Sequence, residues 1–291
     1  MNAGKTLISL VLILVGCASA TPQTESLLVN ARDLPKATAI EGVPFVEQAA
    51  NHCGPATLTM AMNWAGKNVT VEEVTPMVFT PGAKGTFQSD MISASRRQGL
   101  VAIPLEGMND LLKEVSAGNP VVVFENLGLT WYPQWHYAVV FGYDLQHQYV
   151  LMHSGLEANK RWDLRRFERS WKLGDYWGLV VLPPGKLSAT ADELSHMKAA
   201  SALEQIGKIE DAHQAYQAIL TRWPKSLTAA IGMGNIAYTK KDYSAAVRIL
   251  KQASQYHPEN AALKNNLAVA EEAVSAEKTS HKKSPTKGAF H

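Results

Sequence analysis

The sequence predicts an α+β domain followed by an all-α unit. Between residues 40 and 183, helix-like patterns come first and strand-like patterns dominate later, which favours α+β over doubly wound α/β. Pro183-Pro184-Gly185 then interrupts the pattern. From 191 to 274 the chain is rich in alanine, helical in period and self-similar. We therefore expect an α+β domain at 38–185 and a helical repeat unit at 191–274.

Composition allows this organisation and excludes some functions. The chain has 291 residues, 46% of them hydrophobic, and a formal net charge of +2. This length can bury a sizeable core in more than one unit. The near-neutral balance does not suggest a polyanion binder, so we expect no nucleic-acid partner.

The N-terminal segment has the pattern of an export signal. Lys5 precedes an apolar run at 7–15, and Leu14-Val15-Gly16 leads into Cys17. The run is too short to span a bilayer. Residues 1–16 resemble a bacterial lipoprotein signal peptide, whose cleavage would leave Cys17 as the lipidation site. The prediction is a lipid-anchored envelope protein on the periplasmic side of the outer membrane; an ordinary secretory signal or a short anchor helix are the alternatives. Residues 17–37 lack periodicity and are expected to form a tether.

Helix signals occupy the first half of the α+β domain. Pro55 fits the first turn of a helix that starts at Cys53 or Gly54 and stops before Gly66. Thr70 and Glu73 form a capping-box pattern at the start of the next helix. After a short edge segment at 43–46, helices are expected at 53–65, 71–79 and 89–98.

Strand signals dominate the second half of the domain. The β-branched run at 120–124 is typical of a buried strand, and alternation at 136–143 is typical of a strand with two different faces. An aromatic loop at 128–135 separates these two. The remaining elements expected are strands at 100–105, 149–153 and 177–182 and a helix at 109–117.

The helical unit repeats over 34 residues. Pairs at this offset have similar character: Ala212 and Ala246, Tyr216 and Leu250, Ile219 and Ala253, Pro224 and Pro258. This matches the period of tetratricopeptide repeats, which present a concave surface to a protein partner. An unrelated helical bundle is the alternative. The segment 277–291 is basic and polar and is expected to be a disordered tail.

Cys53 is the leading candidate for chemistry. If Cys17 carries lipid, Cys53 has no disulfide partner in an oxidising compartment. A thiol at a helix N-terminus is placed to form a thiolate. Gln48, five residues earlier, offers an amide donor to an oxyanion, and His136, at the start of a strand, offers a base.

Two stretches carry a family resemblance. Gln48-x4-Cys53-Gly54-Pro55-Ala56, with His136-Tyr137-Ala138-Val139-Val140-x-Gly142-Tyr143-Asp144, resembles the bacteriocin-processing, double-glycine-leader family of papain-like cysteine peptidases. The resemblance covers about residues 40 to 183. With the lipoprotein signal and the repeats, the chain resembles a stand-alone lipoprotein group of that family. The resemblance implies that Cys53 is the nucleophile, His136 the general base and Gln48 the oxyanion donor, and that a peptide or protein substrate is cleaved through a thioester.

One position departs from the family. An aspartate normally follows the strand after the histidine, where this chain has Met152-His153-Ser154-Gly155. Ser154 takes the place of the acid, His153 could orient the imidazole instead, and Asp163 could approach from the next segment. A hydroxyl stabilises an imidazolium less than a carboxylate does. The departure leaves room for a slow enzyme, a different acyl acceptor or a degenerate site.

Three functions follow from these observations. The first is an envelope-anchored thiol peptidase whose repeats recruit a partner or substrate. The second is a catalytically silent lipoprotein scaffold that binds peptides, and the third is acyl or amide transfer on the same fold. The His and Cys spacings lack the short pairs of a zinc site, and no phosphate-binding loop with Lys-Ser/Thr occurs, so no metal or cofactor is expected.

Overall fold

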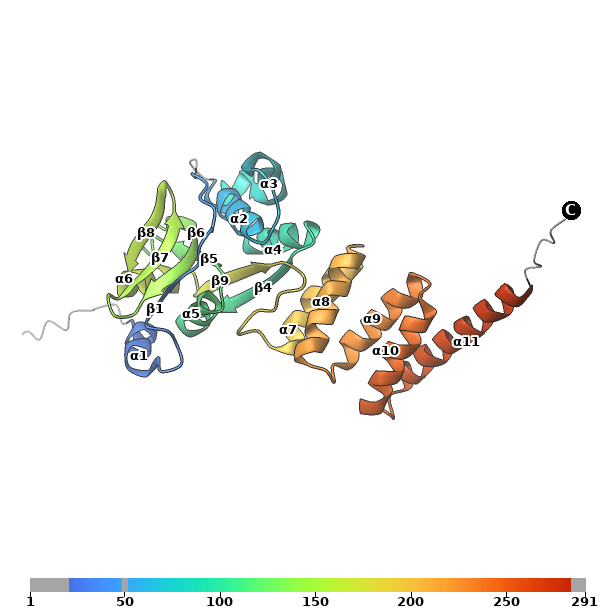
Figure 1. Cartoon of the computed structure of the whole chain (residues 1–291). Coiled ribbons are helices and arrows are strands. Elements are labelled where there is room, and N and C mark those ends of the chain that lie inside the picture. The colour runs from blue at the N-terminus through green and yellow to red at the C-terminus, as the bar shows by residue number, and fades with distance from the viewer. Residues whose placement is uncertain (1–20, 49–51, 284–291) are drawn as a thin grey trace, which may run out of the picture.

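The computed structural model describes residues 21–48 and 52–283. The expected signal peptide and Cys17 lie outside the described residues, as do 284–291. Figure 1 shows a unit of helices and sheet followed by a row of helices. None of the helices in the described ranges combines the length and apolar character needed to cross a membrane.

A seven-stranded sheet organises the first unit, and every strand pair in it is antiparallel. This confirms the predicted α+β class. A short strand β1 (Ala37–Ala39) pairs with the far end of β6, beyond the end of β5, whereas the expected edge segment at 43–46 is not a strand. The other six strands follow the order β4 (Val101–Glu106), β9 (Trp177–Leu182), β5 (Val121–Asn126), β6 (Trp135–Asp144), β7 (Tyr149–Ser154) and β8 (Glu157–Asp163).

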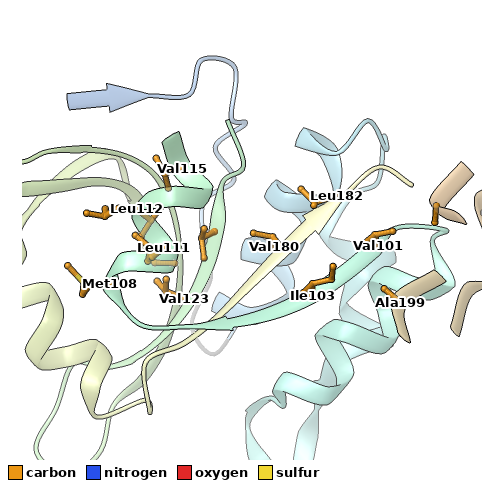
Figure 2. Packing of buried hydrophobic residues seen from close by; sticks show 14 of the residues in the cluster. Val101, Ile103, Met108, Leu111, Leu112, Val115, Val123, Val180, Leu182 and Ala199 are labelled. Atoms are coloured by element: carbon orange, nitrogen blue, oxygen red, sulfur yellow. The ribbon is translucent and has the colours of Figure 1, made fainter. Parts of the chain in front are cut away.

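Helices cover the sheet on both faces. One apolar cluster joins alternate strand residues such as Val122 and Val139 to α2 (Cys53–Trp64), α3 (Val71–Val78) and α4 (Gln88–Arg97). The other joins residues such as Val123 to α5 (Met108–Ser116) and α6 (Leu164–Lys172), and Figure 2 shows Leu111 and Leu112 beside Val123. Neighbouring strand residues serve opposite faces because side chains alternate along a strand. Between α3 and α4, the strands β2 (Phe79–Thr80) and β3 (Gly85–Thr86) form a small hairpin around the 3-10 turn η1 (Pro81–Ala83).

Local signals set several helix ends as predicted. The capping box of α3 is present: Thr70 Oγ1 accepts from the N–H of Glu73, whose carboxylate accepts from the N–H of Thr70. The glycines that follow α2, α4 and α5 have positive φ, which glycine adopts without strain: Gly66, Gly99 and Gly118.

The expected tether at 17–37 is wrong where the structure describes it. Residues Pro22–Asn30 form the helix α1, and Leu27 is buried in the core. The carboxylate of Glu168 on α6 accepts from the N–H groups of Gln23 and Thr24, at 3.0 and 2.7 Å. These N–H groups have no partner inside their own helix. Glu168 is separated from Gln23 by 145 residues in the sequence. Local periodicity therefore could not reveal this helix.

The repeat unit consists of antiparallel helices: α7 (Glu193–Gln205), α8 (Ile209–Arg222), α9 (Leu227–Thr239), α10 (Tyr243–Tyr256) and α11 (Ala261–Lys283). Gly234 allows close packing of α9 on α10, because a Cβ there would lie 2.7 Å from Leu250 Cδ2. The helix α11 continues through 277–283, where the sequence was expected to be disordered. Extension costs little once a packed helix has formed, and this stretch is rich in good helix formers.

A buried carboxylate joins the two units. Glu114 on α5 accepts hydrogen bonds from Asn119 and from the connecting segment: Ser188 Oγ at 2.5 Å, Thr190 Oγ1 at 2.7 Å, Thr190 N at 2.8 Å and Ala189 N at 3.1 Å. Helix α7 packs against the edge strand β4, and Figure 2 shows Ala199 beside Ile103. The first repeat helices therefore share a core with the α+β unit.

Candidate active site

Three predicted residues line one cavity. Cys53 is the first residue of α2, His136 lies near the start of β6, and Gln48 lies in the segment before α2. All three line a cavity of about 650 Å³. The lining also includes residues 83–87, at the end of the β2–β3 hairpin, and residues 133–135 before and at the start of β6. The fold thus brings together a thiol, an imidazole and a carboxamide from three separate segments.

Ser154 is the group that contacts the imidazole. The Nε2 atom of His136 lies 3.0 Å from Ser154 Oγ. In contrast, His153 donates through Nε2 to the carbonyl of Val43 and accepts at Nδ1 from the N–H of Asn159. The expectation that His153 could orient His136 is therefore wrong. The reason is alternation, since consecutive residues of β7 point to opposite faces of the sheet.

Asp163, the third alternative, is also engaged elsewhere. Its carboxylate accepts from the N–H of Arg166 at 3.0 Å and caps α6. An aspartate one residue before a helix is a common N-cap. The idea that Asp163 replaces the family aspartate is therefore wrong as well.

Gln48 is held on both sides of its carboxamide. Its Nε2 donates to Thr57 Oγ1 at 3.1 Å and to the carbonyl of Tyr137 at 3.4 Å, and its Oε1 accepts from the N–H of Gly155 at 3.2 Å. An oxyanion would have to replace one of these acceptors, and the 3.4 Å bond is the weaker. The oxyanion role of Gln48 therefore stays a prediction.

The two reactive groups are neutral at rest. Burial raises the pKa of Cys53, although hydrogen bonds from the N–H groups of Tyr137, Gly54 and Cys53 itself lower it in part. The N–H groups at the helix N-terminus thus lower the pKa of the thiol, as predicted. Desolvation of the thiolate raises this pKa by more. Burial, together with the nearby charge of Lys160, lowers the pKa of His136 to about 4. At neutral pH the site holds a thiol and an uncharged imidazole.

The space beside Gly54 is occupied. A Cβ at this glycine would lie 2.3 Å from Thr86 Oγ1, so the absence of a side chain lets the hairpin close against the start of α2. The hydroxyl of Thr86 is buried and has no hydrogen-bond partner among the described residues, while the Thr86 carbonyl accepts from Tyr137 Oη at 3.1 Å. A glycine beside the nucleophile could give a substrate backbone close access, but here Thr86 occupies that space.

The aromatic residues divide between core and cavity. Trp135, 51% exposed, lines the cavity and stacks on Phe124 with ring centroids 4.9 Å apart. Trp131 is 80% exposed and is not among the lining residues, and Trp171 is fully buried against Phe167. Of these three tryptophans, only Trp135 therefore borders the candidate site.

Sequence reasoning missed two charged residues near the site, Glu125 and Lys160. Glu125 directly follows the run that predicted the strand at 120–124. A carboxylate inside a buried strand is the signal that could have revealed it, because such groups are rarely buried without a partner. Lys160 lies on β8, a strand that showed no apolar alternation. Within 21–48 and 52–283, no three His, Cys, Asp or Glu residues lie together as a possible metal site.

Two family models match parts of this chain. Residues 40–176 match the Peptidase_C39 like family, and residues 203–268 match the tetratricopeptide repeat. The first unit is therefore a C39-like peptidase domain, and the second is a tetratricopeptide repeat region. The chain thus combines the two parts that the sequence predicted, and the family match supports a peptidase-type function. The lipoprotein part of the resemblance concerns residues outside the described ranges and stays a prediction.

Three solved structures resemble about half of this chain. A putative C39-like peptidase from Bacillus anthracis is 18% identical, with 53% of this chain and 100% of that chain covered and a TM-score of 0.45. A double glycine motif protease from an AMS/PCAT transporter, in complex with the leader peptide, is 20% identical over 49% and 93%, with a TM-score of 0.38. The peptidase domain of Streptococcus ComA is 19% identical over 49% and 99%, with a TM-score of 0.40. No curated protein matches the chain.

Proposed function

We propose that this protein is a cysteine peptidase of the bacterial cell envelope, anchored by lipid on Cys17, that cleaves a peptide or protein substrate. The observation that carries the proposal is the shared cavity of Cys53, His136 and Gln48. The hydrogen bond between the His136 ring and Ser154 supports it, because a base must be oriented as well as present.

The neutral resting pair favours general-base catalysis. As the sulfur of Cys53 attacks the substrate carbonyl, His136 takes the thiol proton, and the developing oxyanion needs N–H donors. Collapse of the intermediate breaks the C–N bond, and His136 returns the proton to the leaving amine. Water then attacks the thioester, with His136 again as base, and releases the acid and the free thiol.

The repeats suit recruitment of a protein. Tetratricopeptide arrays present a concave surface to peptides or helices. In this chain the array is held against the catalytic unit by the Glu114 hydrogen bonds and by α7 on β4. A substrate or partner bound to the repeats would therefore stay close to the peptidase domain.

A silent scaffold that binds peptides in the same cavity is the second candidate. It is favoured by the raised pKa of Cys53, the low pKa of His136 and a hydroxyl where the family has a carboxylate. These features weaken activation of the thiol without closing the cavity. Acyl transfer to an amine is the third candidate and would use the same thioester.

The test compares peptides released from bacterial envelope proteins by the wild-type chain and by Cys53→Ala. We expect new N-termini that appear only with the wild-type chain. Equal peptide profiles from both proteins would reject the peptidase and leave the scaffold. Addition of a small primary amine separates hydrolysis from transfer, because a transferase would place the amine on the new C-terminus.

Ser154→Asp is expected to increase activity. A carboxylate on the His136 ring would stabilise the imidazolium and raise the His136 pKa from about 4, as an adjacent opposite charge does elsewhere. We expect kcat/KM to rise about tenfold at pH 7. The measurement is hydrolysis of a substrate identified among the released peptides. Ser154→Asn is the matched control, since it can orient the ring without charge, and equal rates for the Asp and Asn variants would contradict the prediction.

A further inference from the structure

A buried carboxyl group lies directly opposite the candidate base. Glu125 on β5 is the Cα partner of His136 on β6 in the antiparallel ladder. Directly opposite residues project to the same face of a sheet, with Cβ atoms about 5 Å apart. The neighbouring pair on that face, Val123 and Ala138, belongs to the core beneath α5 and α6. Glu125 and His136 therefore project to the same face of the sheet.

Among the residues that the structure describes, none forms an ion pair with this carboxyl group. Glu125 is 1% exposed, and its Oε2 accepts from Ser170 Oγ on α6 at 2.7 Å. Lys160 on β8 is the nearby cation, yet its ammonium contacts Glu157 and the ring of Trp162. A buried carboxyl group with a single hydroxyl partner is costly to keep, and the fold alone gives no reason for it.

The catalytic cycle needs a negative charge at this place. His136 must become an imidazolium when it takes the proton of Cys53, and both burial and Lys160 oppose that charge. Ser154 can orient the ring but brings no charge. A carboxylate on the adjacent strand would offset the cost, because attraction between opposite charges is strong in a buried site.

We propose that Glu125 is a positioning residue of the peptidase reaction, whose carboxylate stabilises the imidazolium of His136 while Ser154 orients the ring. In the family that this chain resembles, one aspartate has this role. Here it is shared by Ser154 on β7 and Glu125 on β5. The proton that His136 gains comes from the thiol of Cys53, and Glu125 exchanges no proton with either group. The inference rests on the proposed function of the same site.

The pKa of Glu125 gives the inference a pH signature. Burial raises this pKa to about 7, against the hydrogen bond from Ser170 and the charge of Lys160, which lower it. The titratable or charged groups that face it are His136 from β6 and Lys160 from β8, and α6 presents the hydroxyl of Ser170. Below about pH 7 Glu125 is neutral and cannot help His136, so the reactivity of Cys53 should rise as pH increases through this value.

The experiment follows alkylation of Cys53 by iodoacetamide in the full-length protein, with the modified peptide quantified by mass spectrometry from pH 5 to 9. This readout needs no known substrate and separates Cys53 from Cys17. We expect Glu125→Gln, which keeps an acceptor for Ser170, to lower the rate constant about tenfold at pH 7.5 and to remove the rise near pH 7. Glu168→Gln, a buried carboxyl group that holds α1 instead, is the control and should keep the wild-type pH profile.

Two further variants distinguish charge from structure. Ser154→Asp in the Glu125→Gln background should restore the rate, because it returns a carboxylate to the imidazole from the other side, and a purely structural defect would not respond. Ser170→Ala leaves Glu125 in place but removes a bond that favours its charged form, so it should move the rise to higher pH.

The outcomes separate this inference from the proposed function. If wild-type Cys53 reacts with the pH rise but Glu125→Gln reacts identically, or Ser170→Ala leaves the rise unmoved, the inference is overturned and the peptidase proposal stands. If His136→Ala leaves alkylation of wild-type Cys53 unaffected across the pH range, the thiol is not activated and both proposals fail. Loss of the rise with rescue by Ser154→Asp supports the inference.

Discussion

Cys53→Ala is expected to abolish covalent labelling of this protein by a peptide that carries a thiol-directed electrophile. The sulfur of Cys53 lies in the shared cavity at the start of α2, and the second cysteine, Cys17, belongs to the expected lipid anchor. Hydrolysis of an identified substrate should fall by at least about 10⁴-fold, because loss of a nucleophile leaves only binding and oxyanion stabilisation. Gel fluorescence of the labelled protein and kcat/KM are the measurements.

Cys17→Ser is the matched control for this experiment. It removes the expected lipid acceptor but leaves the cavity unchanged, so labelling should continue while the protein moves from the membrane fraction to the soluble fraction. The thermal midpoint of Cys53→Ala should stay close to that of the wild type, because alanine fits the start of α2. Persistent labelling of Cys53→Ala at wild-type intensity would remove Cys53 as the nucleophile.

The second large effect concerns stability at the junction of the two units. Glu114→Ala should lower the free energy of unfolding by about 3–5 kcal/mol, because it leaves buried donors from Asn119 and the connecting segment without an acceptor. Urea denaturation at pH 7 measures the change. Cleavage by trypsin after Lys186, in the same segment, should also become faster.

The pH dependence of this contribution has a definite sign. Burial alone would raise the pKa of Glu114, but hydrogen bonds from Ser188, Asn119, Thr190 and the N–H of Ala189 outweigh it and hold the pKa below the ordinary value. A carboxyl group with a lowered folded-state pKa stabilises fully above its unfolded value, near 4.5, and loses this contribution as pH falls through the folded value. The difference in the free energy of unfolding between wild type and Glu114→Ala should therefore decrease only below about pH 4.5.

An exposed glutamate provides the comparison. Glu106 on β4 is exposed to solvent, and Glu106→Ala should change the free energy of unfolding by less than about 0.5 kcal/mol. If Glu114→Ala is no more destabilising than Glu106→Ala, the connecting segment does not depend on this carboxylate. The first repeat helices would then be held chiefly by the apolar contact of α7 with β4.

The sequence predicted those features that depend on residues close together in the chain. Helix α2, with Pro55 in its first turn, the capping box of Thr70 and Glu73, and the strand β9 all follow from local propensity and alternation. The repeat period of 34 residues is also a local regularity, read twice along the chain. The shared site of Gln48, Cys53 and His136 was predicted because the two stretches that contain them resemble a known peptidase family.

The tertiary structure decided which side chain meets which. The partner of the His136 ring could not be identified from the sequence. The pairing of β6 with β7, and the face to which each residue points, show that it is Ser154 and not His153 or Asp163. The position of Glu125 opposite His136 required the register of β5 with β6. Burial, which sets the neutral resting state of Cys53 and His136, depends on packing from many segments. Local patterns reflect the energetic preferences of neighbouring residues. Strand register and desolvation are properties of the whole folded chain, and they set the charge states of the groups in the candidate site.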